Sequence, residues 1–171
     1  MEFKFVNDNA ELNQALFRIT HGLHIVTTRA EERLNGQCLD ALMQGTNAPP
    51  RISIGMGKGS LTHEMIETSG RFVVSVLDRE DPACGDVIRR FGFQSGRDAD
   101  KFAGFAYEVT ELGIPFLPNA VAIYECMVLP DLTTDLGTHS LFVASVDRAG
   151  TREGGEPLTY NEYRKHLRKG G

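Results

Sequence analysis

The amino-acid sequence predicts a mainly β fold, an antiparallel barrel with a few peripheral helices. Hydrophobic and β-branched residues alternate with polar ones in several short segments, a period of two that is typical of half-buried strands. Most of these segments are separated by short turns, whereas a doubly wound parallel sheet would need regularly alternating helices. No GxGxxG motif follows a strand, so a Rossmann dinucleotide site is not indicated.

The first half of the chain combines one expected helix with three expected strands. A helix at 9–20 would place Leu12, Leu16 and Ile19, together with Ala15, on one face. The segment 31–36 is interpreted as a turn, because an Asn-Gly pair readily adopts positive φ. The expected strands are 21–29, 37–46 and 51–56, and Pro49-Pro50 separates the last two.

The second half adds two helices, three strands and a short C-terminal helix. Thr62 is expected to cap a helix that runs to about Ser69, with Gly70 as its stop. Asp81-Pro82 indicates the start of the next helix and Gly92 its end. The expected strands are 71–77, 120–129 and 140–149, and the expected C-terminal amphipathic helix is 160–167.

Length and composition predict one soluble domain over residues 1–171, with 41% hydrophobic and 24% charged residues. The net charge of −5 gives no general attraction to nucleic acid or to an anionic membrane. The three cysteines have neither metal-ligand spacing nor an even number, which favours a reducing cytoplasm. We also expect neither a secretory signal nor a membrane span.

The segment 86–102 carries the strongest functional signal. Two arginines and an aromatic residue lead into Ser95-Gly-Arg-Asp98, and Lys101-Phe102 follows. Arginine is well shaped for phosphate, and the aromatic residues could wall a planar ring. The alternative is a helix that buries Val87, Ile88 and Phe91 and exposes its arginines, which accounts for the helix but poorly for the turn.

Lys58-Gly-Ser-Leu-Thr-His63 lies between a strand and a helix, where backbone N–H groups lack internal partners and attract anions. Ser60 and Thr62 would add hydroxyl donors and Lys58 a positive charge. The alternative is that Thr62 only caps the helix and Lys58 faces solvent. The carboxylate of Glu64 argues against a phosphate at this place.

Two further segments have weaker signals. Gly137-Thr-His-Ser140 enters a strand, and His139 is interpreted either as a ligand-facing group or as a structural histidine. The segment 37–46 could offer backbone groups to the edge of a heterocycle, or be an ordinary edge strand. No histidine spacing completes a metal site, and neither a Ser–His–Asp nor a Cys–His arrangement is defensible.

Taken in order, these segments resemble the flavin reductase-like family, which carries FMN on a split β-barrel of Greek-key topology. The resemblance extends from about Leu16 to Tyr163 and rests on the order and spacing of the motifs. Those motifs include Asn35-Gly36, Lys58–Gly70, Arg90–Phe102, Gly113-Ile-Pro-Phe-Leu117 and Gly137–Phe142. The chain is similar to small flavin reductases and flavoredoxins, including the type found beside rubredoxins.

The resemblance implies a homodimer with FMN at the subunit interface and NADH or NADPH as reductant. It implies that the isoalloxazine edge lies along Leu39, Asp40, Ala41, Leu42, Gln44 and Thr46. Lys58, Ser60 and Thr62 would lie on the phosphate side, and Ser95, Arg97 and Lys101 would close over the cofactor. His139 corresponds to a histidine near the flavin face, where a nicotinamide would stack.

The chain departs from the family pattern at two places. Asp40 replaces the usual Asn, and Ala41 replaces a frequent Ser or Thr. A carboxylate at this place would repel a reduced, anionic flavin. Near the C-terminus, Asn161-Glu-Tyr-Arg164 keeps one of the paired aromatics that the family tends to carry.

The function predicted is transfer of a hydride from NAD(P)H to flavin and on to free flavin, ferric iron or a small redox protein. No side chain need act as a general acid or base. The first alternative is a flavoredoxin-like electron carrier that works with a partner such as rubredoxin or ferredoxin and turns over little NADH. The second is a cofactor-free barrel that serves in dimeric binding.

Overall fold

The computed structural model describes the backbone of residues 2–167 and the side chains of residues 2–165. Its helical elements are α1 (Asn9–Leu16), α2 (Leu61–Ser69), α3 (Cys84–Phe93), the 3₁₀ turn η1 (Pro130–Leu132), α4 (Tyr160–Glu162) and the π-helical turn η2 (Tyr163–Leu167). Its strands are β1 (His24–Ala30), β2 (Arg33–Leu39), β3 (Leu42–Asn47), β4 (Pro50–Gly57), β5 (Arg71–Val76), β6 (Glu108–Val109), β7 (Pro115–Phe116), β8 (Ala122–Val128), β9 (Thr134–Asp135) and β10 (His139–Thr151).

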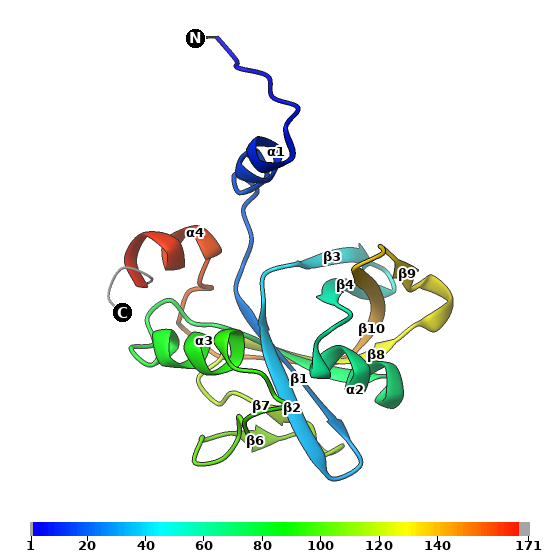
Figure 1. Cartoon of the computed structure of the whole chain (residues 1–171). Helices are drawn as coiled ribbons and strands as arrows, with labels where there is room; N and C mark the ends of the chain where they lie inside the picture. Colours follow the sequence, from blue (N-terminus) through cyan, green and yellow to red (C-terminus); the bar gives the residue numbers. More distant parts are fainter. Residues whose placement is uncertain (1, 168–171) are drawn as a thin grey trace.

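The main sheet is antiparallel and curls into a barrel (Figure 1). Its strands lie in the order β2-β1-β5-β8-β10-β4-β3, and β9 adds to β10. β2 and β3 occupy the two ends of this order, yet they follow each other in the chain across Asp40-Ala41. The sheet therefore turns back on itself at this link, and the predicted mainly β fold is confirmed.

Two hydrophobic clusters lie on opposite faces of the central strands. Ile25 and Val26 are adjacent in β1, and alternation of side chains along a strand sends them into different clusters. The cluster inside the barrel includes Phe72 and Phe142, and the outer one is covered by α3. Burial on both faces explains why β5 is mostly apolar and why β1 and β5 each bury five residues in a row.

Helix α3 covers the outer cluster with Val87, Ile88 and Phe91, as the amphipathic interpretation of this segment predicts. Phe91 packs edge-on against Phe102, with ring centroids 5.4 Å apart. The loop after the helix therefore returns to the same core.

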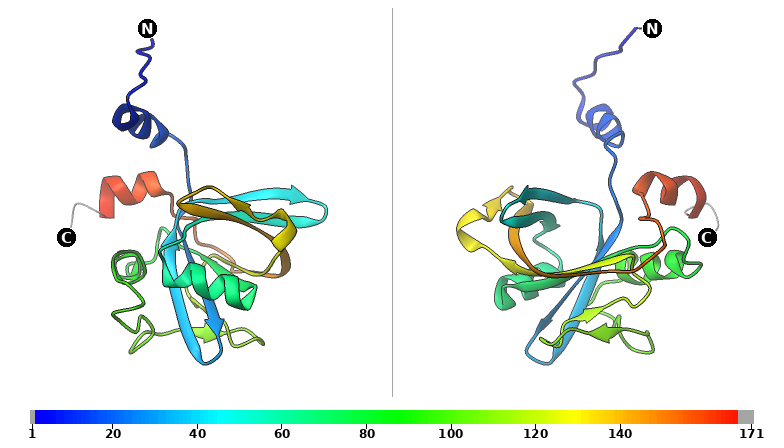
Figure 2. Two further views of the ribbon diagram at one scale, coloured as in Figure 1. Left: turned by 45° about the vertical axis from the view of Figure 1, so that its right-hand side comes forward. Right: turned by 180° about the vertical axis from the view of Figure 1, so that it is seen from behind.

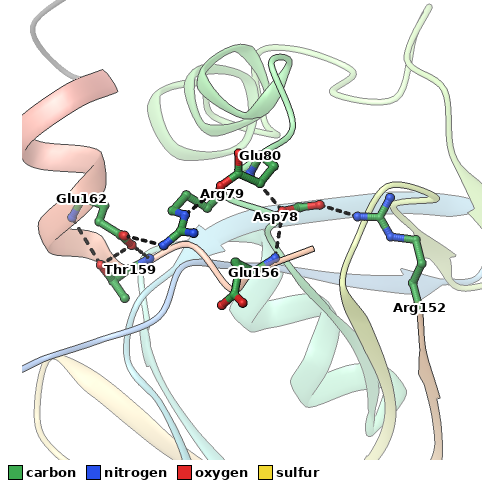
Figure 3. A network of polar contacts seen from close by, with 7 residues as sticks. All are labelled: Asp78, Arg79, Glu80, Arg152, Glu156, Thr159 and Glu162. Atoms are coloured by element: carbon green, nitrogen blue, oxygen red, sulfur yellow. Dashed lines mark hydrogen bonds and ion pairs between the residues drawn. The ribbon is translucent and has the colours of Figure 1, made fainter. Parts of the chain in front are cut away.

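A polar network fastens the C-terminal segment to the end of β5 (Figure 3). The buried carboxylate of Asp78 accepts hydrogen bonds from the backbone N–H groups of Glu80 (2.9 Å) and Glu156 (3.2 Å), and from Arg152. Arg79 reaches Glu162 at 3.2 Å, and Glu162 closes a capping box with Thr159. Backbone hydrogen bonds from Leu23 to Leu158 and from Leu158 to Leu77 complete this attachment.

Helix α1 stands off the barrel in every view (Figure 2). Asp8 caps its N-terminus, accepting from Ala10 at 2.9 Å, but the helix has no buried residue. Phe17 follows directly after this helix, and the Arg164 guanidinium lies over the Phe17 ring, 4.6 Å from its centroid. The apolar stripe expected for this helix therefore exists but faces outward.

Several local predictions are wrong. The first hairpin turns at Glu31, whose φ is 55°, and Asn35-Gly36 lies inside β2. The cap of α2 is Ser60, not Thr62, because the Ser60 hydroxyl accepts from the His63 N–H at 3.1 Å. The expected helix at 9–20 ends at Leu16, and the expected strand 37–46 is broken at Asp40-Ala41 into β2 and β3.

Candidate functional site

A pocket of about 390 Å³ lies where β2, the start of α2 and the end of α3 meet. This volume falls within the range of small-molecule sites. The residues that line it are Asn35, Gln37, Cys38, Gly59, Ser60, Leu61, Thr62, Phe91, Gly92, Gln94, Ser95, Gly96 and Lys101. Four residues predicted from separate segments therefore share one cavity: Ser60, Thr62, Ser95 and Lys101.

The walls of the pocket are held together by close contacts that need glycine. A Cβ at Gly96 would overlap the side-chain amide of Asn35, so the Ser95–Arg97 turn can approach β2 only with glycine there. Asn35 in turn donates from Nδ2 to Thr62 Oγ1 at 3.0 Å, and both side chains are buried. β2, α2 and the loop after α3 are thus fixed relative to one another.

Three hydroxyl groups face the pocket as hydrogen-bond donors. Ser60 accepts from the His63 N–H at 3.1 Å, and Ser95 accepts from the Arg97 N–H at 3.1 Å. Thr62 accepts from Asn35 as described above. Because each oxygen already accepts a bond from the protein, its O–H hydrogen can be donated to a ligand.

The start of α2 adds backbone donors to these hydroxyls. The N–H groups of Leu61 and Thr62 belong to the first turn and have no partner within the helix. A helix N-terminus also carries partial positive charge, which favours a bound anion. Among the described residues that line the pocket there is no Asp or Glu, so the site accepts negative charge.

Lys101 is buried at the inner wall, 4% exposed. Its Nζ donates to the carbonyl oxygens of Gly36 (2.8 Å) and Phe91 (3.2 Å). Burial lowers the pKa of this ammonium to about 8. The side chain thus ties β2 to the end of α3 and brings positive charge to the pocket.

The two other basic residues predicted for the site are engaged by carboxylates. Arg97 pairs with Glu64, and this hydrogen bond lowers the pKa of the Glu64 carboxyl. Lys58 Nζ binds Asp135 Oδ1 at 2.5 Å, which lowers the pKa of Asp135. Neither cation lines the pocket, although the Arg97–Glu64 pair links its two walls.

The predicted flavin-edge segment continues along the chain from the pocket. Leu39 is buried in the barrel core, and its carbonyl lies 3.2 Å from His24 Nδ1. Asp40 and Ala41 form the link to β3, where the Ala41 carbonyl accepts from Gly55 at 2.8 Å. This part can therefore offer backbone and the Asp40 side chain to a ligand.

Farther along, the side chains bond locally and lie apart from this pocket. Gln44 Nε2 donates to Asn47 at 2.7 Å, and Thr46 Oγ1 donates to the Pro49 carbonyl at 2.5 Å. Leu42 and Gln44 line a separate apolar hollow of about 290 Å³ between β3, β4, β8 and β10. Leu42, Gln44 and Thr46 are not brought together with Ser60, Thr62 and Ser95.

His139 lies at the exposed start of β10, opposite Gly57 of β4. Its Nδ1 is 2.9 Å from the hydroxyl of Thr138. Because Gly57 leads into the turn before Ser60, the histidine lies beside the chain that enters the pocket. It does not line the cavity itself.

Asn35 lines the pocket but was not a candidate in the sequence, and Gln37 and Cys38 entered only as part of the weaker segment 37–46. The Asn35-Gly36 pair is a strong turn signal, but in the structure the strand continues on both sides of it. The spacing of Asn35 and Gln37, two residues apart, is the alternation that places side chains on one face of a strand, and it was the available signal.

Within residues 2–165, no group of three His, Cys, Asp or Glu side chains could hold a metal ion. Over the described part of the chain, no helix is both long enough and apolar enough to cross a membrane.

The fold is a split antiparallel barrel, and the pocket at its rim, whose described lining residues include several donors and no carboxylate, is of the kind that suits an anionic small molecule. The family model described as "Flavin reductase like domain" matches residues 16–169. The chain therefore belongs to the flavin reductase-like family, and the predicted family is confirmed.

The relatives include a high molecular weight rubredoxin of Moorella thermoacetica, 43% identical over 150 residues, with 88% of this chain and 64% of the relative covered. A ferric-chelate reductase (NAD(P)H) of Archaeoglobus fulgidus is 37% identical over 159 residues, with 92% and 90% covered. This chain thus matches somewhat less than two thirds of the first relative's length.

Among solved structures, an FMN-binding protein from Thermus thermophilus is similar with a TM-score of 0.72 and 26% identity, covering 80% of this chain and 75% of that one. An NADH:FAD oxidoreductase of Streptomyces globisporus shares the fold with a TM-score of 0.79 at 22% identity, covering 93% and 88%.

Proposed function

We propose that this protein is an FMN-dependent oxidoreductase that takes reducing equivalents from NAD(P)H and delivers them to an acceptor. The relatives named ferric-chelate reductase (NAD(P)H), FMN reductase (NADH) and NADH-dependent flavin reductase support this activity. The acceptor is free flavin, ferric iron or a small redox protein. FMN, when bound, supplies the two-electron chemistry.

The observation that carries the proposal is the convergence of donors in one pocket. The hydroxyls of Ser60, Thr62 and Ser95 and the free N–H groups at the start of α2 suit a phosphate. The absence of a carboxylate among the described lining residues removes the main repulsion. These residues fit an FMN phosphate, and in this reading they bind and orient the cofactor rather than transfer protons.

The isoalloxazine edge is proposed to extend from Gln37 and Cys38 toward Leu39, Asp40, Ala41 and Leu42. His139 is proposed to lie at the nicotinamide side, where its ring would orient the reductant. Gln44 and Thr46 lie apart from the pocket, so a role for these two residues in binding FMN has the least support. Arg97 is proposed to contact the phosphate only after it leaves Glu64.

The test of function is spectroscopic. Protein loaded with FMN should bleach near its visible flavin band when NADH or NADPH is added without oxygen. Each nucleotide should be tried separately by stopped flow. If FMN binds but neither nucleotide reduces it, the reductase activity is refuted.

The second candidate is a flavoredoxin-like electron carrier that accepts electrons from a protein. The relative named high molecular weight rubredoxin and the relatives named diflavin flavoproteins favour it, because their names join this domain type to other redox proteins. It predicts fast reduction by a ferredoxin-type partner and slow reduction by NADH. The same stopped-flow experiment, repeated with a reduced redox protein, separates the two.

We also propose a homodimer built from one domain per chain, acting in the cytoplasm. The exposed apolar residues of α1 support a second copy as partner. Light scattering of the purified protein would report its mass directly.

A further inference from the structure

A second cavity lies between the end of α1 and the C-terminal helical turns, and Figure 2 shows α1 and α4 at the same end of the molecule. Its volume is about 540 Å³, within the range of small-molecule sites. The residues that line it are Gln14, Phe17, Arg18, Asn161, Arg164 and Lys165. It shares no lining residue with the pocket proposed for FMN, so the proposed function does not account for it.

Three cations converge on this second cavity, and no carboxylate in the described part of the chain neutralises them. The lining residues above include two arginines and one lysine but neither Asp nor Glu. Within residues 2–165, no carboxylate pairs with Arg18, Arg164 or Lys165. The chain carries a net charge of −5, so composition does not explain a purely cationic cavity. Like charges that are held together repel, and a bound anion would remove this repulsion.

The acidic side chains that lie closest along the chain are engaged elsewhere. Glu162 closes the capping box with Thr159 and binds Arg79 at 3.2 Å. The hydrogen bonds from Thr159 and the Arg79 guanidinium lower the pKa of Glu162 to about 2, so this carboxylate stays ionised in these contacts. Glu11 on α1 binds Lys4 at 3.0 Å. Neither carboxylate is free to neutralise the second cavity.

The lining of the second cavity suits a phosphate beside a planar ring. Arginine can bind phosphate through two parallel N–H groups, and the amides of Gln14 and Asn161 add neutral donors. The Arg164 guanidinium lies 4.6 Å from the centroid of the Phe17 ring and 5.8 Å from that of Tyr160, which holds it at the cavity. Phe17 still exposes 47% of its surface, so part of its ring is open to a planar ligand group.

We propose that the second cavity binds a nucleotide, a small molecule in which a phosphate group accompanies a planar ring. Arg18, Arg164 and Lys165 bind the phosphate, and Phe17 contacts the ring. The inference goes beyond the proposed function, because none of these residues lines the pocket proposed for FMN.

A nucleotide at this place would fasten α1 to the body of the protein. Arg18 follows α1, whereas Arg164 and Lys165 lie on the C-terminal turn η2, so an anion bound between them bridges the two segments. Helix α1 has no buried residue, and a short isolated helix is only marginally stable in water. We therefore expect the bound nucleotide to slow amide hydrogen exchange in residues 9–18.

The experiment is a calorimetric titration with ADP at low ionic strength, with and without FMN already bound. ADP carries phosphate and a planar ring but no flavin, and bound FMN closes the other pocket to it. The test variant combines Arg18→Gln with Arg164→Gln. The control combines Arg89→Gln with Arg148→Gln, two exposed arginines outside the cavity, and changes the net charge by the same amount. Circular dichroism and thermal unfolding establish that each variant is folded.

We expect wild type and the control to bind ADP with similar dissociation constants, and the test variant to bind it about tenfold more weakly. Salt at about 0.5 M should weaken binding to wild type, because exposed cations are screened. Adenosine, which lacks the phosphate, should bind about tenfold more weakly than ADP. The natural ligand is a free nucleotide if the KM for NADPH is unchanged in the test variant, and the reductant itself if that KM rises.

Three results would each overturn the inference. They are wild-type protein that binds no ADP, a test variant that binds ADP as tightly as wild type, and adenosine that binds as tightly as ADP. If the test variant does not fold, hydrogen exchange of wild type decides: exchange in residues 9–18 that ADP leaves unchanged refutes the nucleotide site. Failure of FMN to bind overturns the proposed function alone, because the titration without FMN still tests the second cavity.

Discussion

At the scale of single residues, the Arg97–Glu64 pair opposes the binding of an anion, because the carboxylate of Glu64 engages a cation at the edge of the pocket. Arg97 lies in the turn that the sequence marks as phosphate-binding, yet its guanidinium is engaged by a carboxylate from α2. Both side chains are about half exposed, so the pair itself contributes little to stability. We therefore expect the pair to affect ligand binding rather than the free energy of unfolding.

Glu64→Gln should release Arg97 and remove a negative charge from the edge of the pocket. We expect FMN to bind up to about fivefold more tightly at low salt, as for a surface pair worth about 1 kcal/mol or less. Glu67→Gln, one turn along the same helix, is the control for loss of charge. Weaker binding by Glu64→Gln would instead mean that the pair preorganises the turn.

Asp78 provides a second prediction at this scale. Burial disfavours its ionised form, but the N–H groups of Glu80 and Glu156 and the Arg152 guanidinium outweigh burial and lower its pKa. A lowered pKa stabilises the fold above the unfolded-state value near 3.9, and this contribution is lost as pH falls through the lower folded-state value.

Asp78→Asn should therefore cost about 1–3 kcal/mol at pH 7, the range for loss of a buried charged acceptor. The difference from wild type should shrink as the pH falls below 4. Urea unfolding at pH 7, 5 and 3 measures it, with the exposed Asp131→Asn as control. A difference that stays constant across these three pH values would contradict the assigned cause.

At the scale of elements, β2 decides where the pocket forms. Gly36 is a glycine because a Cβ there would lie 2.9 Å from Thr27 Cγ2 and 3.0 Å from the Val26 carbonyl. It serves a close approach of strands, not a turn. The same strand carries Asn35, which holds α2 through Thr62.

Gly96→Ala tests this arrangement, because its Cβ would collide with the Asn35 amide. We expect a loss of about 1–3 kcal/mol, as for overpacking, and a melting temperature lower by several degrees. Gly59→Ala is the matched control, since nothing lies within 4 Å of the added Cβ. Equal melting temperatures for the two variants would show that the turn shifts freely.

These elements also show how far sequence reasoning reaches. Strands with a strong hydrophobic pattern, such as β4 and β5, were predicted within a residue or two, because that pattern follows directly from burial. The hairpin turn was expected within 31–36 on the strength of Asn35-Gly36, whereas the chain turns at Glu31, at the start of that range. Local propensity was overridden there by a contact between β2 and α2.

The site was predictable only in part, where its motifs are local in the sequence. Ser60, Thr62, Ser95 and Lys101 were found because their motifs are local in sequence, and the structure brings them together. The partners of Lys101 were not predictable: the Gly36 carbonyl lies 65 residues away in the chain. The engagement of Lys58 by Asp135 depends on the same kind of distant contact, 77 residues apart.

At the scale of the whole molecule, α1 is the part of the fold that one chain does not complete. Leu12 and Leu16 expose 40% and 56% of their surface on a helix that buries none of its residues, and Ile19, three residues after the helix, exposes 52%. A short isolated helix is only marginally stable in water, so its apolar stripe needs a partner surface. A second copy of this chain is the occupant that the family resemblance implies.

Leu16→Glu combined with Ile19→Glu should therefore convert a dimer into monomer, because two charges would be buried against apolar surface. Gln14→Glu, on the opposite face of the helix, is the control and should leave the mass unchanged. Light scattering across a range of protein concentrations measures the shift. If FMN lies at the interface, the double variant should also lose FMN affinity at concentrations where it is monomeric, whereas Gln14→Glu keeps it. A stable dimer in the double variant would place the interface on the barrel and leave α1 without a part in assembly.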